Sequence, residues 1–280
     1  MKDTKNLTIN IKGCLMDLDI PKVMGILNVT PDSFYAHSRS PKESEIIIRV
    51  TQMRAEGVDI IDVGGCSTRP GYEAPSAEEE WQRVDLGCRI IREISPDIPL
   101  SIDTFRASVA KKAVIRWKAD IINDVSGGKD PEMWKTVADL RVPYILTHNP
   151  DGCDATSETS DITASVITDF AKKINQIHRM GVNDVIIDPG FGFAKSLEDN
   201  FRLLDELDQI AKIGLPLLVG VSRKSMIYKT LGCTPEDSLA GTVALNAIAL
   251  EKGADILRVH DVKAAVETVK IFAKLKGLGI

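Results

Sequence analysis

A short apolar run rich in β-branched residues recurs eight times along the 280-residue chain, and each run ends on polar residues or glycine. Continuous hydrophobicity is typical of parallel strands that are covered on both faces, whereas strands with one wet face alternate. The sequence therefore predicts eight parallel strands. In chain order the runs are KVMGILNVT, VDIIDVGG, PLSIDT, ADIINDVSG, PYILTH, DVIIDPG, PLLVGVSR and ADILRVHD.

Segments with helical periodicity separate these runs. Residues 107–119 and 162–181 place apolar side chains at spacings of three and four, and Gly181 and Gly253 stand where helices end. Eight alternating β and α units predict a TIM (β/α)8 barrel, because right-handed crossovers keep the sheet parallel and let it close. A doubly wound open sheet follows the same alternation and is the alternative.

The residues before the first run form a separate pattern. Residues 7–20, LTINIKGCLMDLDI, alternate in polarity around Gly13, which predicts an N-terminal β-hairpin that plugs the bottom of the barrel. Barrels of this class commonly take about 250 residues as one unit. We therefore expect residues 1–280 to be a single domain.

The composition of the chain argues against some classes of binding partner and some cellular compartments. A net charge of −5 and a pI near 5.5 argue against nucleic acid, whose binders carry basic patches. Nowhere do 18 consecutive apolar residues occur, and the N-terminus lacks the pattern of a secretory leader, so we expect neither membrane insertion nor export. Five cysteines without a C-x-x-C pair predict neither disulfides nor zinc and suggest the cytoplasm.

The C-terminal ends of barrel strands converge on one mouth, so the residues that end each run are the candidate site. Carboxylates and amides can pair with the edge of a polar heterocycle, and Arg, Lys and His can hold a phosphate. We expect a ligand that combines both groups. The candidates are Asn28, Thr30, Asp32, Thr68, Arg69, Asp103, Asn123, Asp124, His148, Asp188, Ser222, Arg223, Lys224, Arg258, His260 and Asp261.

Each polar residue taken alone has a structural alternative. An Asp or Asn after a strand most often caps the next helix, and we expect that role for Asp261. Lys195 is equally well explained as a surface charge, and His148 as the anchor of a turn. Capping does not explain Arg258 and His260 together after the eighth run. The set as a whole therefore favours a binding site.

The motifs GILNVTPDSF, IDVGGCSTRPG, SIDT, INDVSGG, IDPGFGFAK, VGVSRKSM and LRVHDV occur in this order over residues 23–262. Together they resemble the dihydropteroate synthase family. The resemblance implies a TIM barrel that binds (7,8-dihydropterin-6-yl)methyl diphosphate. In that family 4-aminobenzoate attacks the methylene carbon as diphosphate leaves, and the enzyme is a homodimer.

The resemblance also implies residue roles. The pterin would be held by Asp103, Asn123, Asp188 and Lys224, and the diphosphate by Asn28, Arg258 and His260. Mg²⁺ would bridge Asn28 and the diphosphate, since this ion prefers oxygen ligands and substrate phosphates. The residues implied for 4-aminobenzoate are Thr68, Arg69, Pro70, Phe193 and Ser222. The catalytic set would be Asp103, Lys224, Arg258 and His260.

Three positions depart from the family's usual pattern. Residues 35–39 read YAHSR where a serine-aspartate-glycine run is common, Cys66 stands where a glutamate is common, and Thr147 stands where a methionine often lies beside the pterin. None of them is an assigned site residue. From these positions the sequence does not determine whether the first loop closes over the substrates.

Three other functions remain as alternatives. A corrinoid-linked methyltransferase shares the pterin-binding barrel but would not be expected to carry NVTPDSF together with SRKSM. A degenerate, non-catalytic pterin-binding barrel would be expected to lose residues such as Arg69 or Arg258. An aldolase would use Lys224 as a Schiff-base lysine, which the neighbouring Arg223 and the surrounding motif disfavour.

Overall fold

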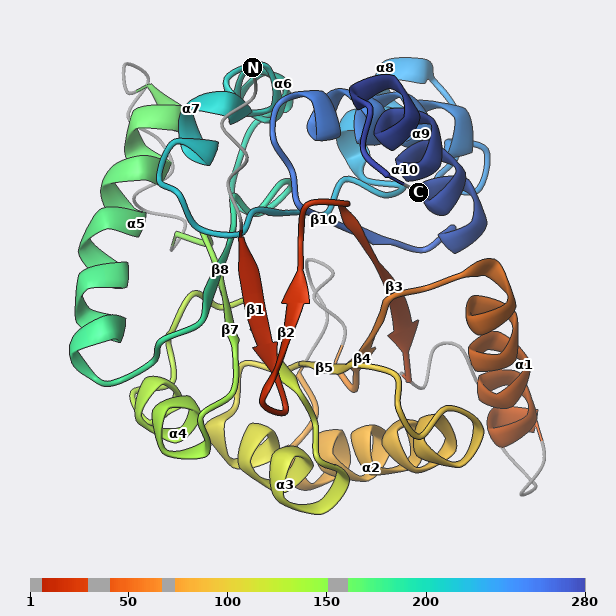
Figure 1. Cartoon of the computed structure of the whole chain (residues 1–280), viewed down its shortest axis with the longest axis vertical. Helices are drawn as coiled ribbons and strands as arrows, with labels where there is room; N and C mark the ends of the chain where they lie inside the picture. The colour runs from red at the N-terminus through yellow and green to blue at the C-terminus, as the bar shows by residue number, and fades with distance from the viewer. Residues whose placement is uncertain (1–6, 30–40, 67–73, 151–160, 280) are drawn as a thin grey trace.

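A computed structural model describes residues 7–29, 41–66, 74–150 and 161–279 of the chain. It begins with strands β1 (Thr8–Ile11) and β2 (Cys14–Asp17), which pair antiparallel. The turn between them consists of Lys12 and Gly13, both with positive φ, as a two-residue hairpin turn of type I′ requires. The predicted N-terminal hairpin is confirmed, and it lies across one end of the barrel (Figure 1).

The eight predicted strands form one parallel sheet in the order β8-β7-β6-β5-β4-β3-β10-β9. Its two edge strands meet through a parallel bridge between Ile187 and Leu217, with Ile187 N donating to Pro216 O at 2.9 Å. This contact closes the barrel and decides against the open doubly wound sheet. The strands are β3 (Lys22–Asn28), β4 (Ile60–Gly64), β5 (Leu100–Asp103), β6 (Ile121–Asp124), β7 (Tyr144–Thr147), β8 (Val185–Asp188), β9 (Leu218–Val219) and β10 (Ile256–Val259).

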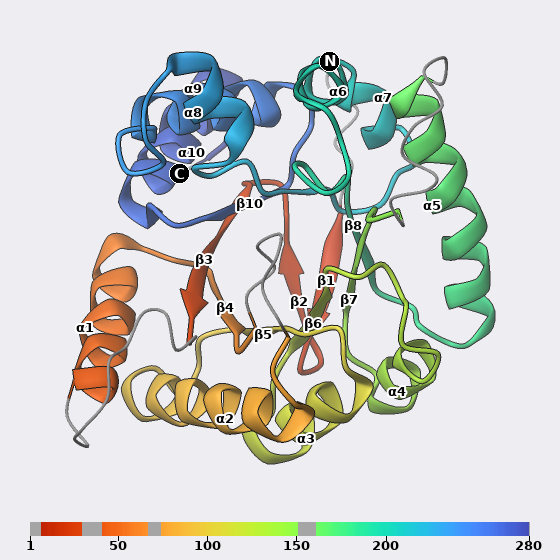
Figure 2. The ribbon, with the colours of Figure 1, turned by 180° about the vertical axis from the view of Figure 1, so that it is seen from behind.

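Helices surround the strands on the outside (Figures 1 and 2). The segments predicted at 107–119 and 162–181 are helical over Ala107–Trp117 and Ile162–Arg179, and Gly181 and Gly253 take positive φ just past helix ends. Within the described ranges, no helix has the length and apolarity needed to cross a bilayer. The helices are α1 (Pro41–Glu56), α2 (Ala77–Ile94), α3 (Ala107–Trp117), α4 (Met133–Leu140), α5 (Ile162–Arg179), α6 (Leu197–Asp205), α7 (Leu207–Ala211), α8 (Ser225–Leu231), α9 (Leu239–Glu251) and α10 (Val262–Lys276).

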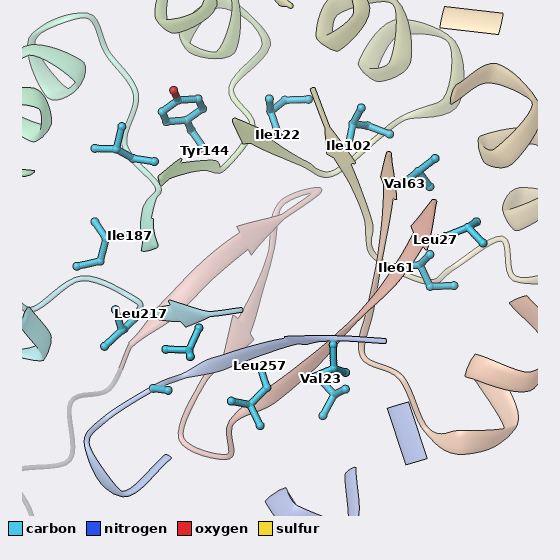
Figure 3. Packing of buried hydrophobic residues seen from close by; sticks show 14 of the residues in the cluster. Val23, Leu27, Ile61, Val63, Ile102, Ile122, Tyr144, Ile187, Leu217 and Leu257 are labelled. Atoms are coloured by element: carbon cyan, nitrogen blue, oxygen red, sulfur yellow. The ribbon is translucent and has the colours of Figure 1, made fainter. Parts of the chain in front are cut away.

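The core has two layers because successive side chains of a strand point to opposite faces. Outward residues such as Val63, Ile102, Ile122 and Leu257 pack with the helices in the larger cluster (Figure 3). Inward residues at the strand starts form a second cluster that the hairpin completes from below. Its buried members are Ile9, Leu18, Met24, Ile60, Ile121, Ile145, Ile186, Leu218 and Ile256.

The same alternation places polar groups above this apolar plug. On five of the strands, the inward apolar residue is followed two positions later by an inward polar residue. The lining of the barrel interior therefore changes from apolar to polar side chains within two residues along these strands. The polar residues are Asp62, Asn123, Thr147, Asp188 and Arg258.

The hairpin plug predicts a specific stability effect. Ile9 is 1% exposed, so Ile9→Ala should lower the free energy of unfolding by about 2–5 kcal/mol through lost burial and the cavity left behind. Leu15 of the same hairpin is 71% exposed, and Leu15→Ala should change it by about 0.5 kcal/mol or less. Urea unfolding measures both. Equal effects of the two substitutions would contradict the plug.

Candidate active site

A buried cluster of charge occupies the interior of the barrel at the strand ends. Arg258 of β10 donates from Nε to Asp62 of β4 at 2.7 Å and from Nη2 to Asp103 of β5 at 2.6 Å. Asn123 of β6 donates to the same Asp62 oxygen at 3.0 Å. Four residues from four strands thus form one hydrogen-bonded network, although Arg258 lies 196 residues from Asp62 in the sequence. The mouth predicted from the strand ends is assembled here.

Burial shifts the protonation of these groups. It raises the pKa of Asp103 to about 7, against the opposing effect of Arg258, and it also raises the pKa of Asp188. Burial alone would lower the pKa of Arg258, but Asp62 and Asp103 together hold it above its ordinary value. Arg258 is therefore a permanent cation, whereas Asp103 can exchange a proton near neutral pH.

Lys224 reaches the mouth from the loop after β9. Its ammonium donates to the carbonyl of Phe191 and lies 4.6 Å from the ring centroid of Phe193. Burial lowers its pKa to about 8, with Asp188 opposing that shift. A Cβ on Gly192 would lie 3.3 Å from the Lys224 side chain, and Gly192 has a φ of +82°. Glycine at this position leaves room for the lysine, and Phe193 is half-buried beside it.

Ser222 and His260 lie against each other on the other side of the mouth. The Ser222 hydroxyl is 3.0 Å from His260 Nδ1 and accepts the backbone N–H of His260 at 3.1 Å. Burial, and then the nearby charge of Arg258, lowers the pKa of His260 to about 4. His260 is thus a neutral imidazole in the free protein at neutral pH, and it can donate a hydrogen bond to an anion without adding charge.

Asn28 ends β3 at the rim, next to the buried cluster. A Cβ built on Gly64 would lie 3.4 Å from Asn28 Oδ1 and 3.6 Å from Asp103 Oδ2, so the two side chains flank the same glycine. The described residues contain no group of three or more His, Cys, Asp or Glu side chains that could hold a metal. Thr30, Asp32, Thr68, Arg69 and Pro70 lie outside the described residues, as do residues 35–39 of the first loop.

Asp62 belongs to this site and escaped the sequence analysis, because it stands inside the run VDIIDVGG rather than at its end. It is fully buried. The signal that marks it is a carboxylate at an inward position two residues after Ile60, in the same place on its strand as Asn123. A charged residue within an otherwise apolar strand requires a buried partner, which here is Arg258.

Several other candidates have structural roles. Asp124 accepts hydrogen bonds from the backbone of Ser126 and from the Tyr144 hydroxyl, and thereby holds the loop after β6. The side-chain cap predicted for Asp261 is wrong: its carboxylate instead accepts two bonds of 2.8 Å from Arg223 and none from the helix backbone. Arg223 also donates to the carbonyls of Pro235 and Glu236, so its guanidinium is engaged within the protein.

Lys195 is not a surface charge. Its ammonium donates to the carbonyls of His148, Gly190 and Phe193, at 3.1, 2.8 and 3.1 Å. Burial lowers its pKa to about 7. Lys195 therefore ties the loop after β7 to the loop after β8 that carries Phe193.

The buried cluster predicts an energetic coupling. In a double-mutant cycle of Asp62→Asn and Arg258→Met, we expect a coupling of about 1–3 kcal/mol, because each single substitution leaves a buried polar partner unsatisfied. The exposed pair Lys112–Glu78 should give less than about 1 kcal/mol when both residues are changed to Ala. Urea unfolding of the single and double variants measures both couplings. Additive effects at Asp62 and Arg258 would contradict the assignment.

Comparison with known proteins identifies the family of this chain. A family model described as "Pterin binding enzyme" matches residues 24–260. The dihydropteroate synthase of Clostridium beijerinckii is 43% identical over 244 residues, covering 86% of this chain and 88% of the relative.

Two solved structures of Xanthomonas albilineans dihydropteroate synthase share the fold. The one with 4-aminobenzoic acid superposes with a TM-score of 0.89 at 37% identity, covering 98% of this chain and 100% of the other. The one in complex with 7,8-dihydropteroate gives 0.85 at 36% identity, covering 97% and 100%. The chain therefore belongs to the pterin binding enzymes and, among them, to the dihydropteroate synthase family.

Proposed function

We propose that the strand-end site joins (7,8-dihydropterin-6-yl)methyl diphosphate to 4-aminobenzoate, giving 7,8-dihydropteroate and diphosphate in folate biosynthesis. The observation that carries this proposal is the buried cluster of Arg258, Asp62, Asp103 and Asn123 beside Lys224 and Asp188. It combines hydrogen-bonding groups for a heterocycle with fixed positive charge for an anionic leaving group. The relatives bound to 4-aminobenzoic acid and to 7,8-dihydropteroate support the same reaction.

The pterin ring fits the acceptors left free in the barrel. Among the described residues, Asn123 Oδ1 is buried with no hydrogen-bond partner, and the side-chain carboxylate of Asp188 accepts only Gly190 N, at 2.8 Å through Oδ1. A buried acceptor without a partner is costly, so a ring that donates N–H groups to these oxygens would repair the deficit. Asp103 and Lys224 would complete the pterin subsite from the remaining sides.

The diphosphate would lie toward Asn28, Arg258 and His260. Arg258 uses Nε and Nη2 to hold the two aspartates, and among the described residues Nη1 has no protein acceptor. That nitrogen can donate to a phosphate oxygen as negative charge develops on the leaving group. His260 is held by Ser222 so that its other ring nitrogen is available for the same purpose.

Mg²⁺ fits the oxygen ligand that Asn28 supplies. This ion keeps several waters and takes one or two protein oxygens together with substrate phosphates, so a cage of carboxylates is not needed. When bound, it would neutralise charge on the departing diphosphate. Asn28 would hold it at the rim beside the pterin subsite.

The 4-aminobenzoate would stack near Phe193 and Ser222, with Thr68, Arg69 and Pro70 as further partners. Its amine nitrogen forms a bond to the methylene carbon while the bond from that carbon to the diphosphate oxygen breaks, and the amine then loses a proton. The carboxylate of Asp103 stabilises the positive charge that builds on the pterin methylene. Positioning supplies most of the help that the nucleophile needs.

We further propose a homodimer formed through α9. This helix is apolar on all sides, yet its outer face leaves Leu239 and Ile248 39% and 43% exposed. A helix that is hydrophobic all round is normally covered. The neighbouring helix α10 packs Val269 and Phe272 within the chain but leaves Ile271 and Leu275 73% and 75% exposed, so it extends the apolar surface of α9.

The free thiols support a cytoplasmic location for this enzyme. Cys14, Cys88 and Cys233 form no disulfide in the described part of the chain. Unpaired cysteines are typical of proteins kept in a reducing compartment.

A dimer formed through α9 should dissociate when a charge is introduced on that helix. Ile248→Glu should convert the protein to a monomer, because a carboxylate would be buried without a partner at the interface. Ile48→Glu, at a site 65% exposed on α1, should leave the dimer intact. Sedimentation velocity distinguishes the two states. A monomeric wild-type protein would rule out this assembly.

The reaction itself is tested by product formation. The wild-type protein, given the pterin diphosphate, Mg²⁺ and labelled 4-aminobenzoate, should form labelled dihydropteroate, and a chelator should abolish this. Arg258→Ala and Lys224→Ala should each lower kcat/KM by about 10²–10³-fold. Lys229→Ala, exposed on α8, is the matched control and should retain activity. Tight binding of the pterin diphosphate without turnover would favour a degenerate binding module, and dependence on a cobalamin protein would favour the methyltransferase.

The shifted pKa values predict a narrow pH optimum. Asp103, with a pKa of about 7, must lose its proton to stabilise positive charge, so kcat/KM should rise up to that pH. Lys224, with a pKa of about 8, loses its charge above that pH, so kcat/KM should then fall. Lys224→Arg should remove the fall at high pH, because a guanidinium stays protonated. A flat wild-type profile between about pH 6 and 9 would contradict these roles.

A further inference from the structure

A second cavity lies at the end of the barrel opposite the active site. Its volume is about 850 Å³, within the range of small-molecule pockets. Its walls come from the segments that precede β5, β6 and β7, and from the tip of the hairpin near α3 and α4 (Figure 1). Lining residues include Lys12, Arg92, Trp117, Lys118 and Arg141. None of the residues assigned to the reaction lines it.

The cavity is positively charged although the chain carries a net charge of −5. Five cations line it, namely Lys12, Arg92, Arg116, Lys118 and Arg141, together with one carboxylate, Asp120. Asp120 is buried and already lies 3.1 Å from both Lys12 and Arg92.

The remaining cations differ in their pairing. Arg116 is paired with Asp85 outside the cavity, at 2.8 Å. Lys118 and Arg141 have no carboxylate partner in the described ranges. Two cations at the C-terminal ends of two different helices thus line the cavity without an ion-pair partner among the described residues.

The backbone at these cations is unusual. Lys118 ends α3 and Arg141 ends α4 in the left-handed conformation, with φ of 52° and 54°, where α8 and α10 use Gly232 and Gly277. Glycine avoids the steric cost of this conformation. Lys12, in the hairpin turn, also has positive φ.

Positive φ at non-glycine residues marks both ends of the barrel. The described residues hold five such positions. Ala194 and Arg223 neighbour the active-site residues Phe193 and Lys224, and the other three line this cavity. Strained backbone concentrates at binding sites.

The rest of the lining is apolar and includes a flat ring. Trp117 is half-buried there, and Val114, Leu140 and Val142 lie in the same wall. The guanidinium of Arg116 stands 5.3 Å from the centre of the Trp117 ring. An aromatic and aliphatic wall beside unpaired cations suits a ligand with a flat ring and an anionic group.

We propose that this cavity binds an organic phosphate that carries a flat ring, separately from the active site. Lys118 and Arg141 would hold the phosphate from the ends of α3 and α4, with Lys12, which also contacts Asp120, beside it on the hairpin. The ring would lie against Trp117. Three cations from three segments match a phosphate dianion better than a single carboxylate.

The test uses 1-naphthyl phosphate as the probe and Trp117 as the reporter. The chain contains three tryptophans, Trp81, Trp117 and Trp134, so protein labelled with 5-fluorotryptophan gives three fluorine NMR signals, which substitution of each tryptophan assigns. Saturating 7,8-dihydropteroate fills the active site during the titration. The phosphate should shift the Trp117 signal in a saturable way and leave the other two unchanged, and inorganic phosphate should bind more weakly.

The decisive variant is Lys118→Gly with Arg141→Gly. Glycine is the residue preferred at left-handed helix ends, so this protein should keep or raise its Tm while the affinity for 1-naphthyl phosphate falls by about tenfold or more. Lys111→Ala with Lys135→Ala removes two exposed cations from the same helices and should leave the affinity unchanged.

Three results would overturn the proposal. The first is an unshifted Trp117 signal at millimolar probe, and the second is an affinity that Lys118→Gly with Arg141→Gly does not weaken. The third is binding of uncharged 1-naphthol as tight as that of the phosphate.

Discussion

The arrangement of the site depends on one guanidinium held between two buried carboxylates. Arg258 joins Asp62 and Asp103 inside the barrel, and Asn123 binds the same oxygen of Asp62. Removing these charges from water costs several kcal/mol for each ion, which only close pairing offsets. The cluster fixes the arginine that would face the diphosphate, while Asn123 and Asp103 keep the geometry that a pterin ring needs. Stability alone would be served equally well by apolar residues.

This cluster exists only because the barrel is closed and its lower half is filled with hydrocarbon. The inward residues of the strand starts, with Ile9 and Leu18 of the hairpin, form a dry layer directly below the charges. Water cannot reach Asp62 and Asp103 from that side, and the resulting desolvation raises the pKa of Asp103 to about 7. Packing at the bottom of the barrel thus contributes to the desolvation that raises the pKa of Asp103.

Local pattern predicted most of the architecture, because each strand is a continuous apolar run and each active-site candidate follows one directly. The eight strands and the meeting of Asp103, Asn123 and Arg258 follow from that rule, and the hairpin follows from the alternating polarity around Gly13. Asp62 did not, because its function depends on a partner 196 residues away that no local window contains. Asp261 and Lys195 show the same limit. Local pattern predicted a cap for Asp261 and explained Lys195 equally well as a surface charge, but partners 38 and 47 residues away in the sequence determine their roles. Thr68, Arg69 and Pro70 rest on family resemblance alone.

The most direct test of this account is a crystal structure of the chain with (7,8-dihydropterin-6-yl)methyl diphosphate and Mg²⁺. The account predicts the pterin ring within hydrogen-bonding distance of Asp103, Asn123 and Asp188, with the diphosphate at Asn28, Arg258 and His260. Arg258 should keep its bond to Asp62 in the complex. A ring bound outside this set, or an arginine that leaves Asp62 to reach the ligand, would contradict the central claim that the buried cluster is built in advance to receive the pterin diphosphate.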